Sequence, residues 1–388
     1  MPPTIVLHEP VVVSQAPADL RQWGPWQFPA VQRLPDGRLA VAFHVEADSA
    51  TAYGMPRRVL LSADEGQSWQ PAEAAVTDIL TSKLIKLPNG DLLRQVQQRS
   101  VAPETVLELL PPSLGETSGG YGHPLTVFDA AQVPAELAGY RFTRRRAGSD
   151  TWLEEHAEVR IPGAIRTLYM GVLTFPWLQR IVPAPDGSLW GVDYGKRLVH
   201  GHVQQQLAAR FLRSTDAGHT WDFLGEIPYQ PDPATDPDAA SRDGFTEPNI
   251  AFLADGSVFC LLRTTDGHGV GPMYSSRSTD GGHTWSIPRW FDDLGVWPAL
   301  VNLACGVTLA AYGRPGLFLR ATTDSAAQTW SERVAVVPPL ALQRDTCSYA
   351  DVLAVGEQEA LIAYSDFNVA DAQGRPCKTI LVRRISLR

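Results

Sequence analysis

The sequence lacks the features that define several common classes of protein. No run of about 18 apolar residues occurs in the chain, so we expect no transmembrane helix. Basic residues are outnumbered, with 33 Lys and Arg against 42 Asp and Glu. The resulting formal net charge of −9 disfavours nucleic acid as the main partner. No amphipathic helix of useful length is apparent, which leaves β-structure as the basis of the fold.

Cysteine is also scarce, and its spacing suggests no metal site. The 388 residues contain four cysteines, Cys260, Cys305, Cys347 and Cys377. They lie too far apart for a zinc motif, so we expect reduced thiols, no metal and no cofactor. The N-terminal sequence has neither the basic segment nor the cleavage site of a signal peptide. We therefore expect a cytoplasmic protein; a signal peptide removed before residue 1 would instead make it a secreted one.

What the chain has instead is a short phrase that it repeats. The phrase reads SADEGQSW from Ser62, STDAGHTW from Ser214 and STDGGHTW from Ser278, and a degenerate copy, TTDSAAQTW, spans 322–330. Asp, Gly and Ser or Thr are the residues of a tight turn, and the Trp can anchor that turn in apolar packing. A motif repeated in this way predicts one supersecondary unit used several times.

A second repeat predicts the architecture. Six pairs of apolar, β-rich segments flank a turn glycine, typical of a β-hairpin. The turn glycines are Gly37, Gly90, Gly187, Gly256, Gly306 and Gly356. Their separations of 53, 97, 69, 50 and 50 residues centre on the length of one four-stranded propeller blade. The sequence therefore predicts an all-β fold, a six-bladed β-propeller of four-stranded antiparallel blades.

The same spacing predicts a single domain with one insertion. We assign residues 1–388 to one propeller and expect segments 5–13 and 378–387 to pair and close the ring. The interval of 97 residues places an insertion in blade two, around 99–170. Such a long insertion could form a lid over the propeller or a surface excursion.

The repeated phrase resembles the Asp box of the sialidase superfamily. The resemblance extends over essentially the whole chain and implies a propeller glycosidase, with the boxes at turns outside the site. Sialidases have a Glu at the start of one inner strand and an Arg sixteen residues later. Here Glu247 and Arg263 stand in that relation. The resemblance implies that Glu247 activates the nucleophile and Arg263 binds a substrate carboxylate; the alternative is a cross-strand ion pair.

Blades five and six supply two further matches. CSYADVL, from Cys347, resembles the family strand that begins with the nucleophilic tyrosine, which makes Tyr349 the candidate. A neutral phenol avoids the repulsion that a carboxylate nucleophile would meet on an acidic sugar. The alternative is an ordinary core tyrosine. In YGRPG, Arg314 fits a carboxylate-binding arginine of the family, and Arg320 is the competing candidate.

Blade one departs from the family pattern. The family has Arg-Ile-Pro-Ala ten residues before the turn glycine, and Gln27 occupies the position of that arginine here. The glutamate that steadies the arginine is also replaced, by Ser365. This paired change predicts a rebuilt subsite in which Gln27 hydrogen-bonds a hydroxyl or a carboxylate oxygen.

The general acid is expected in the loop after the second strand of blade one. Asp48 matches the family's position best, and Glu46 and His44 are the alternatives. The resemblance thus implies a retaining exo-glycosidase that releases a terminal acidic sugar, sialic acid or a related ulosonic acid, from a glycan. Two alternatives stay open: an exo-hydrolase of a neutral or uronic sugar using Glu247 and Asp48 as a carboxylate pair, and a non-catalytic glycan-binding propeller.

Overall fold

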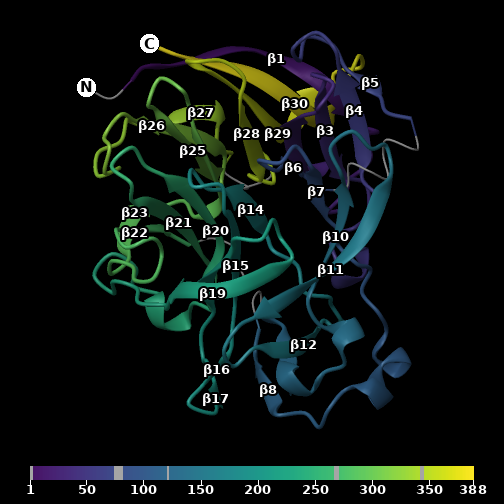
Figure 1. The fold of residues 1–388 in the computed structure, drawn as a ribbon. Helices are drawn as coiled ribbons and strands as arrows, with labels where there is room; N and C mark the ends of the chain where they lie inside the picture. The colour runs from purple at the N-terminus through teal and green to yellow at the C-terminus, as the bar shows by residue number, and fades with distance from the viewer. Residues whose placement is uncertain (1–2, 74–81, 120–121, 266–270, 341–344) are drawn as a thin grey trace.

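The computed structural model of the chain confirms the all-β fold class. It describes residues 3–73, 82–119, 122–265, 271–340 and 345–388. Strands in these ranges form six four-stranded antiparallel units, which we call blades one to six in chain order (Figure 1). Turn glycines join the first two strands of each blade, and in blades one to five they have the positive φ that Asp-Gly, Asn-Gly and related pairs favour.

The strands of the six blades have the following bounds. Blade one contains β2 (Gln27–Arg33), β3 (Leu39–His44), β4 (Arg58–Ser62) and β5 (Gln70–Pro71). Blade two contains β6 (Leu84–Lys86), β7 (Leu92–Gln95), β10 (Tyr140–Arg145) and β11 (Trp152–Arg160). Blade three contains β14 (Arg180–Pro183), β15 (Leu189–Gly195), β18 (Ala208–Ser214) and β19 (Thr220–Ile227). Blade four contains β20 (Gly244–Phe252), β21 (Val258–Thr265), β22 (Met273–Ser278) and β23 (Arg289–Asp292). Blade five contains β24 (Val296–Asn302), β25 (Thr308–Gly313), β26 (Leu317–Thr322) and β27 (Val334–Val337). Blade six contains β28 (Ala350–Ala354), β29 (Glu359–Ala370), β30 (Pro376–Leu387) and the N-terminal β1 (Ile5–Gln15).

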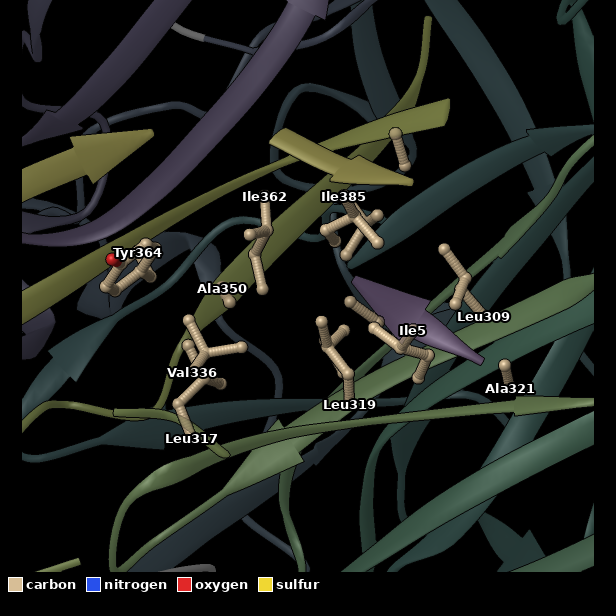
Figure 2. Packing of buried hydrophobic residues seen from close by; sticks show 14 of the residues in the cluster. Ile5, Leu309, Leu317, Leu319, Ala321, Val336, Ala350, Ile362, Tyr364 and Ile385 are labelled. Atoms are coloured by element: carbon tan, nitrogen blue, oxygen red, sulfur yellow. The ribbon is translucent and has the colours of Figure 1, made fainter. Parts of the chain in front are cut away.

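The N-terminal strand closes the ring, as the sequence predicted. β1 pairs antiparallel with β30, from Ile5 opposite Leu387 to Gln15 opposite Thr379, and the two ends of the chain meet (Figure 1). Figure 2 shows Ile5 of β1 among apolar side chains of blades five and six, including Leu309, Leu319 and Ile385. Burial of this cluster between two blades fastens the first strand to the last.

The repeated phrase forms the same turn in each blade where it occurs. In the three intact copies the Ser hydroxyl donates to the Asp two residues later, at 2.7–2.8 Å. The indole N–H of each Trp donates to the carbonyl three residues earlier, from Trp69, Trp221 and Trp285 to Gly66, Gly218 and Gly282. The degenerate copy keeps this last bond, from Trp330 to Ala327 at 2.9 Å. Each turn joins the third strand of its blade to the segment that leads into the fourth.

The range 99–170 contains two different parts. β10 and β11 complete blade two, and β11 also pairs in parallel with β19 of blade three. The other part, together with a short strand just after the range, forms a separate sheet, which we call the inserted sheet. Its strands are β8 (Gly115–Ser118), β9 (Pro124–Asp129), β12 (Ile165–Tyr169) and β13 (Val172–Leu173). The expected insertion is thus divided by two blade strands, because both connections flanking β10 and β11 are long.

The remaining elements are short. A two-stranded ribbon joins β16 (Leu198–Val199) to β17 (His202–Val203). The described turns of 3-10 helix are η1 (Ala50–Ala52), η2 (Pro103–Thr105), η3 (Leu107–Leu109), η5 (Ala130–Gln132), η6 (Ala135–Leu137) and η7 (Ala239–Ser241). Within the described ranges, no helix has the length and apolar character needed to cross a membrane.

Candidate active site

Three inner strands are bulged at the same position of the repeat. Phe28, Glu247 and Trp297 each precede a proline and lie nine residues before a turn glycine. Each has a positive φ, of 55°, 47° and 48°, and lies at a break in the pairing of the first two strands of its blade. Bulges redirect side chains, and a positive φ is strained for residues with a Cβ. All three side chains line one central cavity.

The cavity has a volume of about 1280 Å³ and is lined from all six blades and from the inserted sheet. Among the described residues its wall carries nine basic and five acidic side chains, although the whole protein has a net charge of −9. The basic ones are Arg57, Lys83, Arg160, Arg166, Arg180, Lys196, Arg210, Arg263 and Arg314, and the acidic ones are Asp48, Asp129, Asp193, Glu247 and Asp351. This excess of cations favours an anionic ligand.

Glu247, Arg263 and Tyr349 form a hydrogen-bonded triangle in the cavity wall. The Tyr349 hydroxyl donates to Oε1 of Glu247 in a very short hydrogen bond. Nη1 of Arg263 donates to the same Oε1 at 2.7 Å and to the Tyr349 oxygen at 3.0 Å. Glu247 is 3% exposed and Arg263 1%. A carboxylate that accepts a phenol proton is the arrangement needed to activate that phenol as a nucleophile.

Arg263 contacts both Glu247 and Tyr349, and its expected role as a ligand of the substrate carboxylate stays a prediction. Thr246 and Arg263 face each other across β20 and β21, so the bulge at the next residue brings Glu247 beside the guanidinium. Nη1 of the arginine is therefore engaged by the Glu247–Tyr349 pair, where a positive charge can stabilise a carboxylate or a phenolate. In this structure it is a partner of the two catalytic candidates.

Arg314 lies where the sequence placed it, in the cavity next to Tyr349. Its guanidinium carbon is 5.7 Å from the centre of the Tyr349 ring and 5.2 Å from that of Trp23, and Nη2 donates to the Cys347 carbonyl at 2.7 Å. Arg320, the competing candidate, donates to the Ser331 carbonyl and does not line the cavity. The structure thus brings Arg314 to the cavity and leaves Arg320 in the blade.

Asp48 lies in the cavity wall with its carboxylate held by Trp23. The indole N–H of Trp23 donates to Oδ2 of Asp48 at 3.0 Å. Burial raises the pKa of Asp48; the Trp23 bond opposes that shift, while the charge of Glu247 adds to it. A raised pKa suits a general acid, which must hold its proton near neutral pH.

The two alternatives to Asp48 are disfavoured. His44 lines the cavity, but burial and the charge of Arg57 lower its pKa to about 3, so it is neutral at working pH and holds no transferable acidic proton. Glu46 is absent from the described cavity wall. Of the three candidates, Asp48 alone lines the cavity with a carboxyl whose pKa is raised.

Gln27 is not brought to the cavity, which corrects the expectation that it binds the substrate. Its side chain is fully buried, and Oε1 accepts from the Gly24 amide at 3.0 Å. Neighbouring side chains of a strand point to opposite faces. At this bulge the side chain that faces the cavity is that of the next residue, Phe28. Ser365 is also fully buried, within hydrogen-bonding distance of Cys347. Neither replacement belongs to the cavity wall.

Several site residues escaped the sequence analysis. Trp297 stacks on Tyr349, and the guanidinium carbon of Arg180 lies 4.4 Å from the centre of the Trp297 ring. Arg57 also lines the cavity and has no hydrogen bond or ion pair with any described residue. The signal for Trp297 was available: Phe28-Pro29, Glu247-Pro248 and Trp297-Pro298 share one position of the repeat. The described part of the chain contains no group of three or more metal-ligating side chains.

Comparison with known proteins places the fold. No protein-family model and no curated protein match the chain. A solved protein of unknown function from Dyadobacter fermentans is 18% identical, with a TM-score of 0.67 and 99% of each chain covered. A Hadza microbial sialidase is 14% identical, with a TM-score of 0.53, covering 92% of this chain and 65% of its own. An α-L-arabinofuranosidase from Fusarium graminearum is 13% identical, with a TM-score of 0.52 and 97% of each chain covered. The chain thus has the sialidase-like fold of the β-propeller glycosidases.

Proposed function

We propose that this protein is a retaining exo-glycosidase of the sialidase superfamily that releases a terminal acidic sugar, sialic acid or a related ulosonic acid. The observation that carries the proposal is the hydrogen bond from Tyr349 to Glu247, with Arg263 bonded to both. A base, a phenol and a cation from two different blades meet at one wall of a large cavity. On this proposal the four turns described above correspond to the Asp boxes of that superfamily.

The chemistry follows from the positions of these groups. The Tyr349 oxygen attacks the anomeric carbon while its proton passes to Glu247. Asp48 gives its proton to the leaving oxygen as the glycosidic bond breaks, which leaves a tyrosyl glycoside. Asp48 then takes a proton from water, the water oxygen attacks the anomeric carbon, and Tyr349 leaves with the proton held by Glu247. Two displacements at one carbon retain its configuration.

The acidic nature of the substrate is supported by the charge of the cavity. Arg57, Arg180 and Arg314 line it without an ion pair to any described carboxylate. Charge-assisted hydrogen bonds from such arginines are the strongest contacts available to a sugar carboxylate. With Gln27 outside the wall and Arg263 bonded to Glu247, the carboxylate is held differently from that of ordinary sialidase substrates.

The test combines a panel of aryl glycosides with two variants and a control. Sialic acid, other ulosonic acids, uronic acids and neutral sugars, arabinose among them, are offered to the parent, and the product configuration is followed by NMR. Tyr349→Phe and Glu247→Gln should each lose most of kcat. Tyr364→Phe is the matched control, because Tyr364 is a buried tyrosine of the same blade that does not line the cavity. A fluorinated acidic glycosyl fluoride should label Tyr349, visible by peptide mass spectrometry.

A second candidate function is exo-hydrolysis of a neutral or uronic sugar, with Glu247 and Asp48 as the two carboxylates. The commitment of Arg263 to Glu247 favours it, because fewer cations then remain for a substrate carboxylate. The fold is also shared with an arabinofuranosidase. Full activity of Tyr349→Phe, together with hydrolysis of arabinosides, would select this candidate. Glycan binding without any turnover would select a non-catalytic propeller.

A further inference from the structure

The inserted sheet forms part of the wall of the catalytic cavity. Tyr169 on β12 and His123, which precedes β9, line the same cavity as Asp48 and Tyr349. Their rings meet edge to face with centroids 5.8 Å apart. Figure 1 shows β8 and β12 next to the β16–β17 ribbon, away from β1 and β30. The insertion therefore reaches the site, rather than extending only into solvent.

The inserted sheet is held in a fixed place against the propeller. Nζ of Lys196, which directly follows β15 of blade three, donates to Oγ1 of Thr117 at 3.1 Å and to the Ser118 carbonyl at 2.5 Å. The Leu198 amide donates to the Gly163 carbonyl at 2.7 Å. Lys196 is 3% exposed, so this tie is shielded from water. Because this wall is already fixed, binding a ligand to it does not require the wall to lose conformational freedom.

The loop that carries Asp48 contributes a second tyrosine to this wall. Asp48 is followed by η1 and then by Tyr53, and both side chains line the cavity. The loop is anchored by the Ser100 hydroxyl, which donates to the Ala50 carbonyl at 2.6 Å. At Gly54 a Cβ would meet the backbone of Gln97 and Arg99 at 2.6 Å, so the loop packs directly on the chain that leads to the inserted sheet. Asp48 and the inserted sheet are thus neighbours.

The pKa shifts of Tyr169 and Tyr53 agree with the position of both residues near Asp48. Burial and, to a lesser degree, the charge of Asp48 raise the pKa of Tyr169 to about 12. The pKa of Tyr53 is raised by burial first, and then by Tyr169 and Asp48. Both phenols are therefore neutral at working pH and lie within electrostatic range of Asp48. Asp48 is thus close enough to both rings, and to Glu247, for their charges to interact.

We infer that Tyr53, Tyr169 and His123 form a leaving-group subsite that binds a neutral hexose, the second sugar of the substrate glycan. The inference rests on the proposed function, in which Asp48 protonates the oxygen between the two sugars. Asp48 must reach that oxygen, so the group beyond it is expected beside the residues that neighbour Asp48. Aromatic rings pack against the C–H faces of a sugar, while phenol and imidazole groups hydrogen-bond its hydroxyls. A volume of about 1280 Å³ exceeds the usual range for one small ligand.

The experiment compares two substrates that share the same acidic sugar, a lactoside and a methyl glycoside. Tyr169→Ala should raise KM for the lactoside about tenfold or more and leave the methyl glycoside within about twofold. The KM of Tyr169→Phe for the lactoside should lie between the values of the parent and of Tyr169→Ala. Leu168→Ala is the matched control, because Leu168 lies on the same strand and packs into the core of the inserted sheet. An equal loss on both substrates, or an equal loss in Leu168→Ala, would overturn the subsite.

A binding measurement keeps this test separate from the proposed function. Lactose alone is titrated into the protein and followed by saturation-transfer NMR, which requires no turnover. Binding to the parent and to Leu168→Ala, with loss in Tyr169→Ala, supports the subsite even if no glycoside is hydrolysed. Hydrolysis without any lactose binding leaves the proposed function standing and removes the subsite. Preference for an apolar aryl leaving group over lactose, lost in Tyr169→Ala, would also overturn the assignment to a sugar.

Discussion

Trp297 and Tyr349 stack on each other, with ring centroids 4.5 Å apart and planes inclined by 29°. Phe28 meets the same phenol ring edge to face at 4.8 Å. Trp297 comes from blade five and Phe28 from blade one, the two neighbours of the blade that carries Tyr349. Bulges aim both aromatic side chains at the phenol, so its orientation toward Glu247 is set by two packed rings as well as by hydrogen bonds.

Trp297 is therefore predicted to position Tyr349, the proposed nucleophile. Trp297→Ala should lower kcat by about 10²-fold, the cost of a small misplacement of a reacting group, with a much smaller change in KM. Trp297→Phe should recover most of the activity because it restores a flat ring at this place. The exposed Trp290 supplies the control substitution, Trp290→Ala. Equal losses in Trp297→Ala and Trp297→Phe would contradict a role based on stacking.

The second prediction concerns the pH dependence set by Asp48. Trp23 donates a hydrogen bond to the Asp48 carboxylate and thereby lowers a pKa that burial raises. Trp23→Phe removes the donor and keeps an aromatic ring, so the pKa of Asp48 should rise. The acid works when protonated, so its protonated form should persist to higher pH. The alkaline limb of kcat/KM should then move to higher pH, measured on one aryl glycoside.

A matched experiment identifies Asp48 as the origin of that limb. Asp48→Asn should abolish the limb and slow substrates with poor leaving groups far more than activated aryl glycosides, which need no acid. If the alkaline limb of kcat/KM is unchanged in both Trp23→Phe and Asp48→Asn, a group other than Asp48 is its origin.

The fold was predictable because its signals are local. Turn glycines and the Ser-Asp-Gly-Trp phrase specify hairpins through φ angles and hydrogen bonds within a few residues. The pairing of β1 with β30 followed from the requirement that a ring of blades leave no open edge. The division of 99–170 was not predictable, because β10 and β11 carry no turn glycine of the repeat and their pairing with β7 is a long-range contact.

The candidate site was predictable where family spacing coincides with the bulge, as at Glu247. It was not predictable at Gln27. The alternation of side chains along a regular strand predicts which residues face the cavity. A bulge adds one residue to the strand, so the neighbouring side chain faces the cavity in place of the predicted one. The hydrogen bond between Arg263 and Tyr349 joins blades four and six, and no local sequence pattern predicts such a long-range contact.

The third prediction follows from the burial of Gln27. If its position were a carboxylate subsite, Gln27→Arg would improve turnover of sialosides. The structure predicts no improvement and a loss of stability, because the arginine would enter a fully buried place without a carboxylate partner. Thermal unfolding and sialoside kinetics measure both effects. Gln27→Met, of similar length and uncharged, is the control for the loss of the amide alone.

The last prediction concerns the repeated turn, which is expected to stabilise the fold without acting in the site. Trp221 is fully buried, donates to the Gly218 carbonyl at 3.1 Å and stacks on Phe142 with centroids 6.0 Å apart. Trp221→Ala should cost about 3–5 kcal/mol of unfolding free energy, as for other large buried aromatic residues. Trp330→Ala in the degenerate copy should cost less, because Trp330 is only partly buried. Denaturant unfolding monitored by circular dichroism gives both values. Because neither residue lines the cavity, kcat of the folded variants should match the parent; a selective loss of kcat in Trp221→Ala would give the turn a part in the site.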